Sequence, residues 1–167
     1  MPKPSPADPQ PDPRPGARPG RIWQGDREKA YRPLARATRR AAFEAGLAAY
    51  ARGDFFEAHE LLEPAWMGTS DLAERALYQG LIKLAAGYVH AIRGNPIGLA
   101  RNLEGARRHL QTSLDLDPGW GSSLGIELPG LLDAIDDRLA AIRALAALVE
   151  SSPAAMLDLA ADAPHIR

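Results

Sequence analysis

The sequence contains no cysteine, few aromatic residues and no long apolar run, and each absence excludes a class of protein. Without cysteine the chain forms no disulfide and no thiolate site, so any metal would have to be bound by His, Asp or Glu. No apolar stretch approaches the ~20 residues that a membrane helix needs, and no apolar leader opens the sequence. We therefore expect a cytoplasmic protein with no membrane contact.

Aromatic residues make up only 6% of the chain, whereas Ala and Leu dominate the 46% of residues that are hydrophobic. This mixture favours helix over strand, and no alternating strand pattern interrupts it. The length of 167 residues suits one compact domain with tails.

Charge is distributed unevenly along the chain, although the net charge is only −1. Residues 1–52 carry eleven Lys and Arg against five Asp and Glu, whereas residues 115–167 carry three against nine. Solvated charge is the simplest interpretation, and attraction between copies, giving an oligomer, is the alternative. Few aromatic residues accompany the basic stretch, which argues against nucleic-acid binding.

The chain divides into three parts. Eight of the first twenty residues are proline, so we expect residues 1–26 to form a disordered Pro-rich tail. Residues 27–150 should form the helical domain, and residues 151–167 a short helix and a C-terminal tail. Deleting residues 1–21 should leave the melting temperature nearly unchanged, because this segment has little apolar surface to bury.

Helical periodicity and capping residues predict one all-α bundle of five to six antiparallel helices. Asp54 with Glu57, and Asp71 with Glu74, have the spacing of a capping box at the start of a helix. Pro64 lies inside its helix and should kink it. The first helix pair is distantly tetratricopeptide-like, although no second copy follows. The expected helices are 34–51, 55–66, 75–93, 96–116 and one that begins at 129.

The second expected helix carries polar residues on an apolar stripe. His59 and Glu63, four residues apart, fall on the same face as Phe55, Leu62 and Trp66, while Glu60 lies at the margin of that face. A carboxylate on a core-facing stripe must be paired, protonated or bound to a ligand. A neighbouring carboxylate can also orient an imidazole and raise its basicity.

The third expected helix carries a matching polar row among small residues. Gln79, Lys83 and His90 share one face, and antiparallel packing would bring this row against His59 and Glu63. Small side chains in that row would let a helix or a ligand approach closely. We therefore predict that these groups converge on one pocket or one buried network.

Three functions fit such a group of residues. The first is a binding or interaction protein whose polar pocket takes a small ligand or a protein segment. The second is a hydrolase-like or metal-dependent enzyme, with His59 as general base oriented by Glu63 and with His90 as a second acid or base. The third is a purely structural network.

Known metal-binding patterns are incomplete in this sequence. The run H-E-L-L-E has Glu63 where the zinc motif H-E-x-x-H requires a second histidine. A di-iron bundle requires Glu-x-x-His on two helices, and the sequence contains none. We therefore assign no metal ligands, and the sequence indicates no particular cofactor.

Three segments together resemble a bacterial family catalogued as domain of unknown function 309: F-F-E-A-H-E-L-L-E-P-A-W at 55–66, Y-Q-G-L-I-K-L-A-A-G at 78–87 and H-A-I-R-G-N at 90–95. The resemblance covers residues 43–114, and Pro64 departs from the family's usual helix former. It implies a small all-helical fold and no agreed activity. The positions that match the family's pattern are His59, Glu60, Glu63, Trp66, Gln79, Gly80, His90, Gly94 and Asn95.

Overall fold

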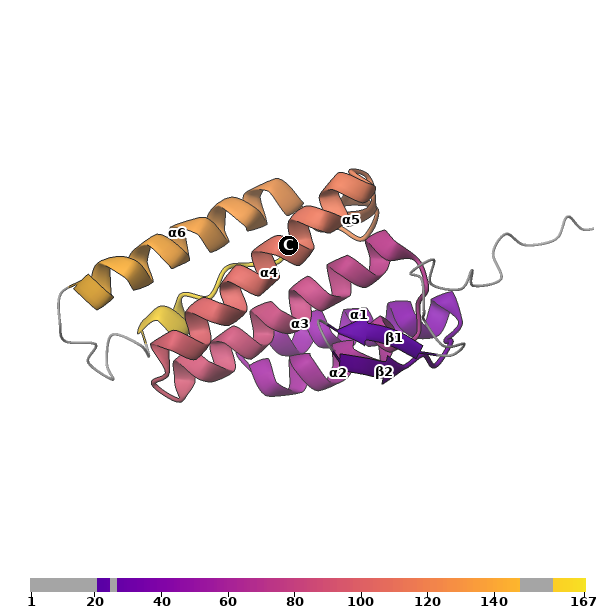
Figure 1. Ribbon diagram of the computed structural model, residues 1–167, viewed down its shortest axis with the longest axis horizontal. Helices are drawn as coiled ribbons and strands as arrows, with labels where there is room; N and C mark the ends of the chain where they lie inside the picture. Colours follow the sequence, from indigo (N-terminus) through magenta and orange to yellow (C-terminus); the bar gives the residue numbers. More distant parts are fainter. Residues whose placement is uncertain (1–20, 25–26, 148–157) are drawn as a thin grey trace, which may run out of the picture.

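The structure is a computed structural model that describes residues 21–24, 27–147 and 158–167 (Figure 1). Most of the predicted Pro-rich tail, and the first part of the 151–167 segment in which a short helix is predicted, lie outside these residues. Residues 158–161 form a single helical turn within the described C-terminal segment.

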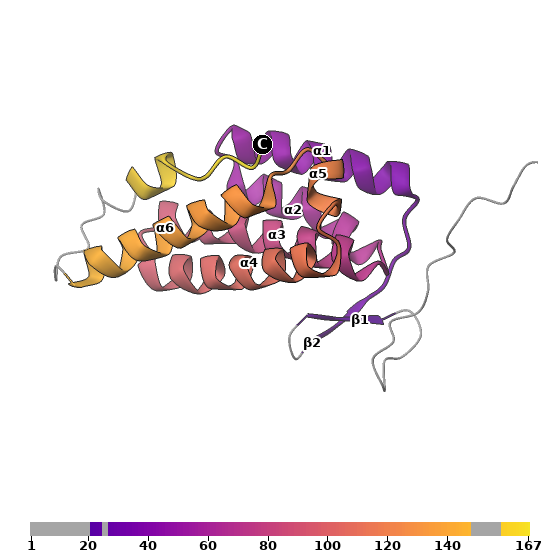
Figure 2. The ribbon, with the colours of Figure 1, turned by 90° about the horizontal axis from the view of Figure 1, so that it is seen from above.

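The described helices form an all-α bundle, as the sequence predicts. Contacts follow chain order, from α1 through α2 and α3 to α4, and α6 packs on α4 (Figures 1 and 2). The short α5 connects α4 to α6. The helices are α1 (Arg36–Ala51), α2 (Phe55–Met67), α3 (Leu72–Ile92), α4 (Pro96–Leu116), α5 (Trp120–Ser123) and α6 (Leu128–Ala147).

A two-stranded hairpin precedes the bundle and corrects two expectations. Strands β1 (Arg21–Gln24) and β2 (Arg27–Ala30) pair antiparallel, with Arg21 opposite Ala30, where the sequence predicts tail and then helix. Figure 2 shows this hairpin to one side of the helices. Gly and Asp are the two residues between the strands in the sequence, and such a pair is a signal for a two-residue hairpin turn.

The first helix begins at Arg36, because the residues before it pair with the end of α2. The backbone N–H groups of Arg32 and Leu34 donate to the carbonyl oxygens of Met67 and Gly68, both at 3.0 Å. These hydrogen bonds hold the entry to the bundle extended. They also place the start of α1 beside the connection between α2 and α3.

The predicted helix caps are present. Asp54 and Asp71 accept hydrogen bonds from the backbone N–H groups of Glu57 and Glu74. Asn95, which was not predicted as a cap, accepts one from Gly98 at the start of α4. Gly53 has a φ of +79°, a left-handed conformation that ends the first helix at little cost for glycine. The second helix continues through Pro64 to Met67.

The core is built around α3, which buries most of its length. Phe55, Leu62 and Trp66 are 5%, 1% and 1% exposed, so the apolar stripe predicted on α2 is confirmed. Phe55 also packs against the rings of Tyr50 and Tyr88, with centroids 5.1 and 5.2 Å away.

Glycines allow α3 and α4 to approach closely. A Cβ added at Gly80 would lie 2.6 Å from Cγ of Leu110 and 3.2 Å from its backbone nitrogen. A Cβ added at Gly87 would meet its nearest neighbours, Asn102 and Leu99, at 3.4 Å, which is close to ordinary contact. The two helical positions therefore differ in the space available to a methyl group.

Replacing Gly80 with alanine should lower the free energy of unfolding by about 1–3 kcal/mol, because the methyl group overpacks the interface with α4. Gly87→Ala is the matched control, and it should be neutral or stabilising by up to about 1 kcal/mol, because alanine is the better helix former. Urea denaturation monitored by circular dichroism measures both values. Equal effects of the two substitutions would contradict this account of the interface.

Candidate functional site

The predicted site residues on α2 lie at the border of the buried stripe. Nδ1 of His59 is 3.2 Å from Oε1 of Glu60, and the two side chains are 31% and 55% exposed. Glu63 is half-buried and Trp66 is buried, and each interacts with at least one other residue. His59 and Glu63 therefore lie where the core meets solvent.

The predicted residues on α3 contact α4. Nδ1 of His90 is 3.2 Å from Nδ2 of Asn95 and 2.5 Å from the position of a Cβ at Gly98. Cδ of Lys83 lies 2.6 Å from the corresponding position at Gly105, and Gln79 is buried. The structure thus brings Lys83 and His90 against α4, whereas the sequence analysis directed them towards α2. Convergence of His90 with His59 and Glu63 stays a prediction.

Lys83 belongs to a cationic group on the interface between α3 and α4. Burial, and then the charge of Arg108, lower the pKa of the Lys83 ammonium. Burial, and then the charges of Lys83 and Arg108, lower the pKa of His109 to about 4. His109 is therefore neutral at pH 7 in the folded protein.

The free energy of unfolding should fall as the pH is lowered from 6.5 towards 4, because the unfolded chain then binds a proton that His109 in the folded protein does not bind. We expect a loss of about 1 kcal/mol, less than the full shift implies, because the half-buried ring is partly screened by solvent. His109→Gln should flatten this part of the pH profile of urea unfolding. An unchanged profile in the variant would show that His109 is not responsible.

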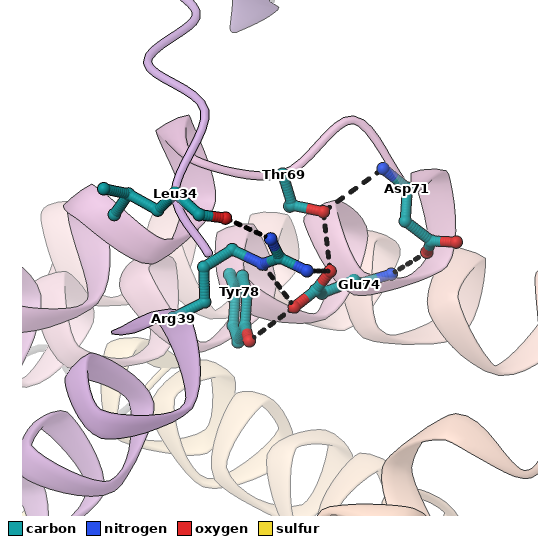
Figure 3. Close-up of polar contacts among 6 residues, drawn as sticks. All are labelled: Leu34, Arg39, Thr69, Asp71, Glu74 and Tyr78. Atoms are coloured by element: carbon teal, nitrogen blue, oxygen red, sulfur yellow. Dashed lines mark hydrogen bonds and ion pairs between the residues drawn. The ribbon is translucent and has the colours of Figure 1, made fainter. Parts of the chain in front are cut away.

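A polar network that the sequence analysis missed surrounds Glu74 in the first turn of α3 (Figure 3). Nε and Nη2 of Arg39 donate to the two carboxylate oxygens of Glu74, each at 3.0 Å. The hydroxyls of Thr69 and Tyr78 donate to the same carboxylate at 2.6 and 2.8 Å. Four hydrogen bonds from three elements of the fold therefore hold one carboxylate.

Local structure positions the members of this network. Asp71 caps α3 by accepting from the N–H of Glu74 at 2.8 Å, and its own N–H donates to the hydroxyl of Thr69 at 3.2 Å. In an ordinary capping box the glutamate would reach back to the cap residue. Here Thr69 accepts the N–H of Asp71, and the carboxylate of Glu74 is held by Arg39, Tyr78 and Thr69.

The network is buried and charged. The side chains of Arg39 and Glu74 are 17% and 4% exposed. Burial opposes the charge on Arg39, but the hydrogen bonds and attraction of Glu74 outweigh it, so the pKa of Arg39 is raised. Burial and the adjacent Glu74 also raise the pKa of the Tyr78 phenol, which therefore stays protonated and donates.

A cleft of about 500 Å³ adjoins this network, and we call it the Glu74 cleft. Arg39, Thr69 and Glu74 form part of its wall, and Arg36 contributes a further cation, whose guanidinium lies 5.9 Å from the centre of the Trp120 ring. The other lining residues are Tyr31, Pro33, Leu34, Ala35, Gly68, Ser70, Asp71 and Trp120.

Two residues that line the Glu74 cleft each have a hydrogen-bond donor without a partner. The hydroxyl of Tyr31 and the indole N–H of Trp120 are shielded from solvent, and neither has a hydrogen bond to any described residue. Unsatisfied donors of this kind are rare in proteins and call for an explanation. The sequence carries no signal for this pair, because 89 residues separate Tyr31 from Trp120.

The fold and this site define an all-helical domain with a buried ion-pair network beside a polar cleft. Residues 43–102 match the model of a family described as a domain of unknown function (DUF309), so the chain carries a DUF309 domain at these residues. No curated protein and no solved structure matches the chain. The match contains Thr69, Asp71, Glu74 and Tyr78 of the network, and Arg39 precedes it.

In the described part of the chain, no group of three or more His, Asp or Glu residues is arranged to hold a metal ion. No helix in the same residues is both long and apolar enough to cross a membrane.

Proposed function

We propose that this protein is a binding protein and that the Glu74 cleft is its ligand site. The observation that carries the proposal is a pair of unpartnered donors, the Tyr31 hydroxyl and the Trp120 indole N–H, which belong to two residues that line one cleft. A ligand oxygen that accepts from them would remove the cost of leaving both donors unsatisfied. The volume of about 500 Å³ suits a small molecule or a few residues of a peptide.

The surroundings of the two donors specify the ligand further. Arg36 lines the same cleft and adds a guanidinium, whereas the charge of Arg39 is already matched by Glu74. The ligand should therefore present acceptor oxygens, either neutral or anionic, towards Tyr31, Trp120 and Arg36. The Arg39–Glu74 pair gives the cleft a rigid wall, which limits the entropy lost on binding.

The indole N–H of Trp120 provides a direct test by nuclear magnetic resonance. Its ¹H–¹⁵N signal is assigned with Trp120→Phe, and the full chain is titrated with acetate, N-methylacetamide and inorganic phosphate. We expect at least one probe to shift this signal saturably, and Arg36→Gln to weaken the binding of an anionic probe.

Arg40→Gln is the matched control for Arg36→Gln. Arg40 is also on α1, but it pairs with Glu44 at 2.7 Å and does not line the Glu74 cleft. Its replacement should leave the titration unchanged. The proposal is wrong if no probe shifts the Trp120 signal, or if the two arginine substitutions weaken binding equally.

The pocket predicted around His59, Glu63 and His90 stays a second candidate for partner binding. The half-buried positions of His59, Glu63, Lys83 and His90 support it, because a partner could still reach such side chains. A chemical-shift map of the bound protein distinguishes the candidates. Shifts at the histidine rings with none at Trp120 would favour this second surface.

A further inference from the structure

A second cavity lies at the other end of α1, beneath the C-terminal segment, residues 158–167. It has a volume of about 570 Å³ and is lined by the α1–α2 connection and by residues 160–167. Figure 2 shows this segment running back towards α1. Ala160 and Ile166 are each 7% exposed, so the segment packs on the core.

Ion pairs hold the C-terminal segment in place over the bundle. Arg167 donates to Glu44 of α1 at 2.6 Å, and its guanidinium lies 5.7 Å from the centre of the Phe43 ring. Arg138 of α6 contacts the carboxylate of Asp162 at 2.5 Å and its backbone oxygen at 3.0 Å. The segment is thus attached at its middle and at its last residue, which makes it a defined wall of the cavity.

The walls of the cavity are mostly apolar, and one lining residue has a buried polar atom without a partner. Leu47, Phe55, Ile92 and Ile166 supply apolar walls. Tyr50 also lines it, is 6% exposed, and its hydroxyl has no hydrogen-bond partner in the described residues. Burial raises the pKa of this phenol, so the hydroxyl remains protonated and can donate a hydrogen bond to a ligand.

We propose that this cavity binds an aliphatic carboxylate, with the chain against the apolar walls and the carboxylate accepting from Tyr50. A mainly apolar pocket of ~300–1,000 Å³ with a few placed polar groups is the usual form of a small-molecule site. Arg52 and Arg167 line the same cavity and add positive charge near the carboxylate, although each also pairs with a glutamate, Glu57 and Glu44 respectively. This site is separate from the Glu74 cleft and does not depend on it.

Decanoate below its micelle concentration is the probe, and isothermal titration calorimetry of the full chain is the measurement. We expect saturable binding of one molecule, weakened about fivefold to tenfold by Tyr50→Phe, because one hydrogen bond of about 1 kcal/mol is lost. The same substitution should not lower the melting temperature of the free protein, since it removes an unsatisfied hydroxyl.

Tyr88→Phe is the matched control. Tyr88 is also a buried tyrosine, its ring centroid is 6.4 Å from that of Tyr50, and it does not line the cavity. This substitution should leave the affinity for decanoate unchanged. Equal losses in the two tyrosine variants would overturn the proposal, as would an affinity that Tyr50→Phe leaves unaltered.

Two further measurements test the cavity and the carboxylate. Ala51 is an exposed lining residue, so Ala51→Trp should occupy the cavity and abolish binding while the circular dichroism spectrum is retained. 1-Decanol should bind more weakly than decanoate, because it carries no charge for Arg52 and Arg167. Binding that survives Ala51→Trp, or equal affinity for the alcohol, would overturn the assignment.

Discussion

Replacing Glu74 with glutamine is expected to lower the free energy of unfolding by about 3–5 kcal/mol, the usual cost of breaking a buried ion pair by removing one charge. The carboxylate is 4% exposed and accepts four hydrogen bonds, two of them from Arg39. A glutamine amide has the same shape, but its NH₂ group would face donors that need an acceptor, so their hydrogen bonds would be lost. Arg39 would then remain as a largely buried charge without its partner. Urea denaturation at pH 7 measures the loss.

Glu57→Gln is the control for this substitution. Glu57 pairs with Arg52 at 3.1 Å, but the two side chains are 48% and 60% exposed, so the loss should be at most about 1 kcal/mol. The double variant Arg39→Met with Glu74→Leu should cost less than Glu74→Gln alone, because it leaves no charge unpaired. A Glu74→Gln protein no less stable than Glu57→Gln would contradict the account of the network.

Trp66→Ala should also lower the free energy of unfolding, by about 3–5 kcal/mol, because it removes the largest side chain from the core and leaves a cavity. Trp66 is 1% exposed at the end of α2. Trp120→Ala is the control, since Trp120 is only partly buried, and it should cost less. The midpoint and slope of urea denaturation separate a loss of stability from a change in the unfolded state. An unchanged midpoint for Trp66→Ala would show that its burial contributes nothing.

The cationic group at Lys83 illustrates the limit of a helical wheel. The pattern correctly placed Gln79, Lys83 and His90 on one face of α3, since that depends only on helical geometry. The wheel does not specify which helix occupies the space beside that face. Glycines at 98 and 105 of α4 leave room for His90 and Lys83, and these contacts direct the two side chains to α4.

The Gly-Asp pair between β1 and β2 shows a different limit. This turn signal was present in the sequence, but it follows a Pro-rich stretch whose composition indicated a continuous tail. Composition averages over many residues, whereas the signal for a hairpin turn lies in the two residues of the turn itself. Helix α1 likewise begins at Arg36 and not at the predicted residue 34, because hydrogen bonds to Met67 and Gly68 hold the preceding residues extended.

The sequence by itself determined the all-helical class, the helix caps at Asp54 and Asp71, and the buried stripe of α2, since each depends on residues within one or two helical turns. Only the tertiary structure decided the two candidate sites. Arg39 meets Glu74 across 35 residues, and the C-terminal segment encloses Tyr50 from more than a hundred residues away. Such contacts arise from the packing of whole helices, which no local pattern encodes.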